Sequence, residues 1–289
     1  MSVTENQSVR ICRRMDMIGR KIMIMSGKGG VGKTTVTANL ARALVKAGYS
    51  VGILDIDIHG PNIGKMLGCE DNLLTGQEGS INPVVSPEGI RVVSMSFAIE
   101  NSDEAIVFRG SMKLNVIRQF IADVNWGNLD YLLIDTPPGT GDEQLAAAQN
   151  IPALAGCIIV TTPQDVAIMD SARSVSFARQ LNLRIIGVIE NMSGFDCPHC
   201  GQHIDIFGSG GAQELCTRDG IPLLGKIPLD IQIRKDGQGQ GSLALSGIAG
   251  LVHGLTKPLS SADVGYVPQN DGCSPSSCAS CKSDCPSRK

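Results

Sequence analysis

Short apolar runs recur along the chain, and patterns typical of helices separate them. Each run is nearly continuous rather than alternating, which is typical of strands buried on both faces of a sheet. Between the first two runs, residues 34–47 place apolar side chains on one helical face, and Gly48 supplies a stop signal. A second helix is expected to begin at Asp165, a residue type that favours the N-cap. The expected strands are 22–25, 51–54, 131–134, 157–161, 185–189 and 223–227.

This order of strand, helix and strand predicts an α/β fold, in which a parallel sheet is flanked by helices and the crossovers are right-handed. We divide the chain into a flexible N-terminal segment, residues 1–20, a folded domain, residues 21–256, and a tail, residues 257–289. The tail holds eight Ser, four Cys and few large apolar residues. It therefore cannot bury enough surface to fold alone.

Composition narrows the classes of function. Apolar residues make up 42% of the chain and charged residues 18%, so the bulk is globular. The net charge of -3 argues against nucleic acid as a partner, because that binding relies on neutralising phosphates. No apolar run reaches the roughly 18 residues of a membrane span, and no signal-peptide pattern follows the N-terminal arginines. We expect a cytoplasmic protein whose ten cysteines serve metal ligation rather than disulfides.

The strand at 22–25 leads into a glycine-rich segment, residues 26–35, with the sequence SGKGGVGKTT. It fits the phosphate-loop spacing G-x-x-x-x-G-K-[ST] in the strand-to-helix setting that this motif requires. Glycines let successive backbone N–H groups turn toward one anion, and the helix N-terminus adds partial positive charge. Lys33 would bridge the β- and γ-phosphates, and the Thr34 hydroxyl would hold Mg²⁺. The alternative is a glycine-rich turn without a ligand.

A second lysine, Lys28, precedes the usual one. Residues 28–34, KGGVGKT, resemble the deviant phosphate loop of the family that contains MinD, ParA, the nitrogenase iron protein and the Mrp/Nbp scaffolds. In that family the early lysine reaches across a two-fold axis to the partner's nucleotide. The resemblance implies that Lys28 acts in trans and that ATP binding controls formation of a homodimer. The alternative is a solvated lysine.

Two acidic segments resemble further parts of the same family. Residues 54–62 resemble its first switch, and residues 133–139 resemble its Mg²⁺-associated strand and second switch. Ligands of open α/β sheets collect at the carboxyl ends of strands, so these segments should converge, and Mg²⁺ prefers oxygen ligands. We expect Asp135 to hold a Mg²⁺-bound water and Asp57, in preference to Asp55, to position the attacking water. Simple turn or cap roles are the alternative.

Two more residues are assigned by the resemblance. Gly139 would offer its N–H to the γ-phosphate and sense its loss. Asn191 matches the position where the family reads the purine ring, and a carboxamide suits this task because it donates and accepts hydrogen bonds. The expected catalytic residues are Lys28, Lys33, Asp57 and Asp135, and the expected nucleotide-binding residues are Gly27, Lys28, Gly29, Gly30, Val31, Gly32, Lys33, Thr34, Thr35, Gly139 and Asn191.

A pair of cysteines, Cys197 and Cys200, lies in residues 191–201, NMSGFDCPHCG, which closely resemble the Mrp/ApbC/Nbp branch of iron–sulfur cluster carriers. The resemblance extends over residues 21–250. One C-x-x-C supplies two thiolates, whereas Zn²⁺ or an iron–sulfur cluster generally takes four ligands. A two-fold dimer supplies two plus two at its axis, so we expect a bridging 4Fe–4S cluster. A zinc knuckle and a redox dithiol are the alternatives.

The tail carries four further cysteines, whose spacing could wrap one metal centre without a folded core. We expect a second iron–sulfur or zinc site there, and a tail with unused thiols is the alternative. His203 is close enough to Cys200 in the sequence to remain open as a ligand. The tail cysteines are Cys273, Cys278, Cys281 and Cys285, and the isolated cysteines are Cys12, Cys69, Cys157 and Cys216.

Together these features predict a homodimeric, slow ATPase that uses ATP and Mg²⁺, carries an iron–sulfur cluster and transfers it to apoproteins. Two other classes compete with this interpretation. A spatial-regulator ATPase of the MinD/ParA type calls for a membrane helix or a basic DNA face, and the tail is rich in Ser and Cys instead. A nucleotide-gated electron-transfer protein of the nitrogenase-reductase kind has widely separated cluster cysteines, unlike the C-x-x-C here.

Overall fold

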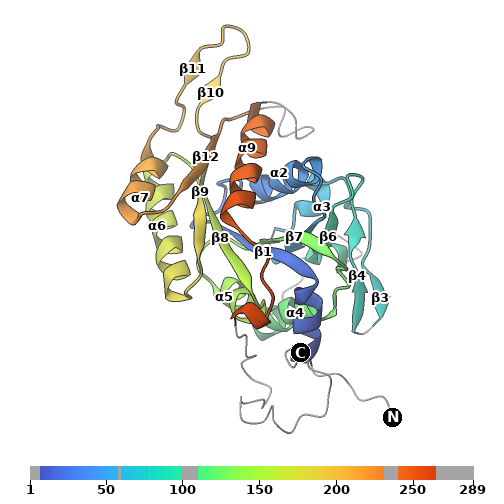
Figure 1. Ribbon diagram of the computed structural model, residues 1–289. Helices are drawn as coiled ribbons and strands as arrows, with labels where there is room; N and C mark the ends of the chain where they lie inside the picture. The colour runs from blue at the N-terminus through green and yellow to red at the C-terminus, as the bar shows by residue number, and fades with distance from the viewer. Residues whose placement is uncertain (1–6, 58–59, 78, 99–109, 231–239, 265–289) are drawn as a thin grey trace, which may run out of the picture.

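A mostly parallel sheet forms the centre of the protein (Figure 1). The computed structural model describes residues 7–57, 60–77, 79–98, 110–230 and 240–264. The eight strands follow the order β12-β9-β8-β1-β7-β2-β6-β5, and each neighbouring pair is parallel except β5 with β6. The strands are β1 (Ile18–Met25), β2 (Val51–Asp55), β5 (Val84–Val85), β6 (Arg91–Ser94), β7 (Leu129–Asp135), β8 (Leu154–Thr161), β9 (Ile185–Asn191) and β12 (Leu223–Ile227). The predicted α/β fold and all six predicted strands are confirmed; β5 and β6 were not predicted.

Helices cover both faces of this sheet (Figure 1). Helices α2 and α9 pack on one face, and α1, α4, α5, α6 and α7 lie on the other. Alternate residues of β1 show the division, because Ile22 and Ile24 join the core under α2 and α9 while Met23 and Met25 join the opposite core. The helices are α1 (Gln7–Asp16), α2 (Lys33–Lys46), α3 (Ile63–Met66), α4 (Gly110–Asp123), α5 (Asp142–Asn150), α6 (Asp165–Gln180), α7 (Gly211–Asp219) and α9 (Gln240–Leu255).

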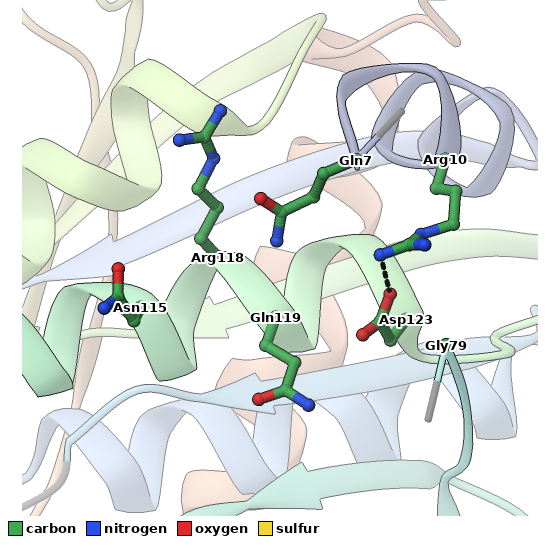
Figure 2. A pocket seen from close by; sticks show the side chains of 7 residues that line it. All are labelled: Gln7, Arg10, Gly79, Asn115, Arg118, Gln119 and Asp123. Atoms are coloured by element: carbon green, nitrogen blue, oxygen red, sulfur yellow. Dashed lines mark ion pairs between the residues drawn. The ribbon is translucent and has the colours of Figure 1, made fainter. Parts of the chain in front are cut away.

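The N-terminal region packs onto the domain from residue 7 onward, which differs from the flexible segment expected for residues 1–20. Helix α1 buries Ile11 and Met15, which are four residues apart and therefore share one helical face. Arg10 forms an ion pair with the buried Asp123 of α4 at 3.1 Å (Figure 2). The arginine-rich composition concealed this amphipathic helix. Residues 1–6 lie outside the described residues.

The C-terminal boundary also differs from the expected one. Residues 257–264 pack against β1, where the Leu259 N–H donates to the Gly19 carbonyl at 2.9 Å. The buried Lys21 ammonium donates to the carbonyl oxygens of Met15, Ile18 and Leu259 at 3.0–3.1 Å. Burial lowers the pKa of Lys21 to about 8. Residues 257–264 are thus held against the domain instead of belonging to the tail expected from residue 257, and the cysteine-rich part lies outside the described residues.

A helix that crosses a membrane must be long and apolar. Within the ranges that the structure covers, none of the helices combines the length and the apolar character needed to cross a membrane.

Candidate functional site

The predicted phosphate loop connects the end of β1 to the start of α2. Gly30 and Gly32 adopt φ angles of 82° and 80°, a region that favours glycine. A Cβ atom at Gly27 would overlap the backbone of Asp170 on α6. The loop forms a wall of a cavity of about 620 Å³, a volume typical of small-molecule sites. The cavity is lined by residues 26, 28–35, 57, 60, 62, 65, 66 and 138.

A buried ion pair between Lys33 and Asp135 lies at the centre of the site. The Lys33 Nζ atom is 2.6 Å from Asp135 Oδ1, and the two side chains are 6% and 0% exposed. The Thr34 hydroxyl donates to Asp135 Oδ2 at 2.7 Å, and the Thr37 hydroxyl lies 2.9 Å from Oδ1. The residues predicted to hold phosphate and Mg²⁺ are therefore brought together around one carboxylate. Thr37 was missed by sequence reasoning, although its place one turn after Lys33 on α2 was a usable signal.

The two aspartates after β2 face different surroundings. Asp55 is 1% exposed; its carboxylate accepts hydrogen bonds from the Ser94 hydroxyl at 2.9 Å and the Asp57 N–H at 3.0 Å. Burial, followed by the nearby charge of Asp135, raises the pKa of Asp55 well above its usual value. Asp57 is half-buried and lines the cavity. The geometry thus favours Asp57 over Asp55 for contact with a nucleotide, and its role in positioning water stays a prediction.

A buried glutamine holds the loop that follows β7, and sequence reasoning missed it. Gln144 on α5 donates to the carbonyl oxygens of Pro137 at 2.6 Å and Gly139 at 2.9 Å, and it accepts from the Gly141 N–H. Gly139 has a φ angle of 91°, and its N–H donates to the Ser26 carbonyl at 2.8 Å. Gly139 therefore lies beside the phosphate loop, while its contact with a γ-phosphate stays a prediction. The signal for Gln144 was its N3 position after a helix start.

Lys28 and Asn191 contact the site in different ways. Lys28 lines the cavity and is exposed, and its action on a partner's nucleotide stays a prediction. Asn191, the last residue of β9, is 8% exposed and donates from Nδ2 to the Val31 carbonyl of the phosphate loop at 2.9 Å. The structure thus brings Asn191 to the loop, and its contact with a purine stays a prediction.

Cys197 and Cys200 lie on a hairpin that projects from the end of the sheet (Figure 1). Its strands are β10 (Phe195–Asp196) and β11 (His203–Ile204). The turn is closed by hydrogen bonds from the Cys197 N–H to the Gln202 carbonyl at 3.0 Å and from the Gly201 N–H to the Cys197 carbonyl at 2.8 Å. Hydrogen bonds from the backbone N–H groups of Cys200 and then His199 lower the pKa of the Cys197 thiol. The turn thus stabilises the thiolate, the form that binds metals.

The isolated cysteines have the opposite electrostatics. Cys69, Cys157 and Cys216 are buried, and loss of hydration raises the pKa of their thiols to about 11, 12 and 11. They stay protonated at neutral pH and are poor metal ligands. Cys12 is half-buried on α1. Among the described cysteines, the hairpin pair is therefore the one suited to metal chemistry.

His203, left open as a ligand, is engaged by carboxylates. Its Nδ1 atom is 2.6 Å from Asp196 Oδ1, and its Nε2 atom is 3.2 Å from Asp205 Oδ1. The hydrogen bond to Asp196 is the main cause that raises the pKa of His203. Over the described parts of the chain, no group of three or more Cys, His, Asp or Glu could hold a metal ion. One chain thus offers two hairpin thiols, and Cys273, Cys278, Cys281 and Cys285 lie outside the described residues.

The helix-covered parallel sheet, the glycine-rich loop that ends β1, and the lysine and hydroxyl at the start of α2 define a P-loop NTPase. The chain belongs to the NUBPL iron-transfer P-loop NTPase family, whose model matches residues 17–248.

Individual relatives agree with this assignment. The chain is 51% identical over 229 residues to an iron-sulfur cluster carrier protein of Methanocaldococcus jannaschii, covering 79% of each chain. It is 46% identical over 217 residues to a cytosolic Fe-S cluster assembly factor of Eremothecium gossypii, covering 72% of this chain and 77% of that one. A nucleotide-binding protein of Archaeoglobus fulgidus in complex with ADP superposes with a TM-score of 0.70 at 38% identity, over 83% of this chain and 92% of that one.

Proposed function

We propose that the protein is an ATP-dependent carrier that binds a 4Fe–4S cluster between two copies of the chain and transfers it to apoproteins in the cytosol. The observation that carries the proposal is the exposed Cys197–Cys200 turn, which stabilises a thiolate on a P-loop domain. Relatives at 46–51% identity are named as iron–sulfur cluster carriers or assembly factors, which supports the choice of cargo.

The number of ligands supports a homodimer. A cluster of this kind takes four thiolates, and one hairpin supplies two. A two-fold axis beside the hairpin doubles the set, because isologous contacts repeat the same patch. Lys28, exposed at the nucleotide cavity, would complete the partner's site when the two copies meet.

Nucleotide binding would rearrange the Lys33–Asp135 pair. Lys33 would leave Asp135 for the phosphates, and the main-chain N–H groups of residues 29–34 would surround the β-phosphate. The oxygens of Thr34 and Asp135 fit Mg²⁺, which prefers such ligands and would neutralise phosphate charge when bound. Asp57, at the cavity wall, would orient the attacking water. Hydrolysis would be slow, as in a switch.

The tail cysteines would form a separate iron–sulfur or zinc site. The chain leaves the domain beside β1, where residues 257–264 are anchored. The last described turn (Ala262–Val264, red) and the cysteine hairpin lie at opposite ends of the molecule in Figure 1. We expect occupancy of the two sites to be separable by truncation.

The proposal is tested by anaerobic reconstitution, with iron and sulfide counted per dimer and the cluster type read from Mössbauer spectra. Cys197→Ala and Cys200→Ala should each lose the bridging cluster, whereas the matched control Cys12→Ala should keep it. Truncation after Gly272 should remove the additional tail metal only. A Cys197→Ala, Cys200→Ala double variant that loads the bridging cluster normally would refute the site. Transfer to an apoprotein and phosphate release are then measured on the intact chain.

A further inference from the structure

A buried carboxylate forms hydrogen bonds with both ends of the segment that carries the cysteine pair. Glu190, in β9, is 0% exposed. Its Oε1 atom accepts from the Ser193 hydroxyl at 2.6 Å, and its Oε2 atom accepts from the Ala212 N–H at 3.1 Å. Ser193 precedes the hairpin and Ala212 follows it, so the Glu190 side chain is hydrogen-bonded to both ends of the segment that contains the hairpin. Lys226 of β12 lies 3.5 Å away and supplies a cation.

The next residue of β9 holds the phosphate loop. Asn191 donates to the Val31 carbonyl, and a Cβ at Gly32 would overlap its Nδ2 atom. The loop and this carboxamide are therefore in close contact, so a shift of the loop backbone would disturb the hydrogen bond of Asn191. The chain then turns through Met192, whose φ angle of 56° is unusual for a residue other than glycine. Such strain is found at switch segments.

We propose that Glu190 is a positioning residue, which passes the state of the phosphate loop from Asn191 to the Cys197–Cys200 turn. The inference rests on the proposed function and adds its route of regulation. Nucleotide contacts at the Val31–Gly32 backbone displace the Asn191 carboxamide, and the adjoining Glu190 moves both anchor points of the hairpin together. The two cysteines then differ in accessibility between the nucleotide-free and nucleotide-bound states.

Site-resolved alkylation of Cys197 and Cys200 tests this link. Reduced, cluster-free full-length protein is treated with iodoacetamide, with and without Mg²⁺ and a non-hydrolysable ATP analogue, and the peptides are quantified by mass spectrometry. In the native chain the analogue should change the rate by about fivefold or more, the lower end of typical allosteric coupling. Glu190→Ala should bring the ratio to within about twofold of one while still binding the analogue. Glu190→Gln should keep the ratio, because an amide can accept from Ala212 and donate to Ser193.

The controls separate this link from folding and from dimerisation. Glu214→Ala, which removes an exposed carboxylate from the same helix α7, should keep the native ratio. If Glu190→Ala does not fold, Ser193→Ala decides, since it removes one anchor and should reduce the nucleotide effect on the alkylation rate to about twofold or less. A native chain without a nucleotide effect, or an effect that survives both Glu190→Ala and Ser193→Ala, overturns the link. If the nucleotide shielded the two cysteines only by bringing two copies of the chain together, the effect on alkylation would persist in both variants. The proposed function fails on a different measurement, the absence of iron and sulfide on Cys197 and Cys200.

Discussion

The buried Lys33–Asp135 ion pair should contribute measurably to the free energy of unfolding of the nucleotide-free protein. At 2.6 Å, an effective dielectric constant of about 20 gives a Coulomb attraction of about 6 kcal/mol. Lys33→Met would leave Asp135 buried beside Asp55 without its cation. Losing one partner of a buried pair costs about 3–5 kcal/mol, so we expect the free energy of unfolding to fall by that amount.

Asp135→Asn should cost less than Lys33→Met, because Asp55 still faces the lysine: the Lys33 charge favours the ionised form of Asp55. The double variant should recover part of the loss, since it buries neither charge. Each variant is unfolded in urea without nucleotide, and the fluorescence of the single, buried Trp126 reports the transition. Single effects that add in the double variant to within about 0.5 kcal/mol would refute a direct interaction.

Three further predictions follow from the same site. Asp55→Asn should stabilise the protein at pH 7. The raised pKa of Asp55 means that its protonated form favours the folded state, and this contribution to stability is lost as the pH rises through that pKa. In urea unfolding, the gain from the substitution should vanish below about pH 4, where the carboxyl is protonated in the unfolded chain as well. Gly27→Ala should destabilise the domain by about 1–3 kcal/mol and weaken ATP binding in calorimetry, since the methyl group meets the Asp170 backbone. Lys28→Ala should leave stability within about 0.5 kcal/mol, as expected at an exposed position, and abolish ATP-dependent dimerisation in light scattering.

The sequence predicted those strands whose apolar residues follow one another nearly without a gap. Strands such as β8 and β9 contain continuous apolar runs and are buried on both faces, so adjacent residues in the sequence already indicate their burial. The four-residue β6 begins with Arg91 and ends with Ser94, and its strand character depends on pairing with β2. Helix α1 was missed because its arginines dominate the composition, while two buried apolar side chains, Ile11 and Met15, form the face that packs on the domain.

The candidate site shows the same limit. The phosphate loop is local, so its spacing identified residues 28–35, which form one wall of the cavity. The contacts of Gln144 with the Pro137 carbonyl and of Glu190 with the Ala212 N–H depend on how the loops after β7 and β9 fold back, which the motif spacing alone did not predict. A charge at the end of the apolar run 185–189 was a signal for Glu190, because a carboxylate in a central strand needs partners.

The contacts of β9 constrain how a carrier of this design can use ATP. Asn191 touches the phosphate loop and Glu190 anchors the cysteine hairpin, so the two sites share one strand end. Linkage is reciprocal. If a bound nucleotide lowers the affinity for the cluster by some factor, the cluster lowers the affinity for that nucleotide by the same factor. ATP that promotes release must therefore bind more tightly to the cluster-free protein. Under the proposed function, hydrolysis would reset a chain that has already delivered its cargo, and a slow turnover would suffice for a carrier that acts once per cluster.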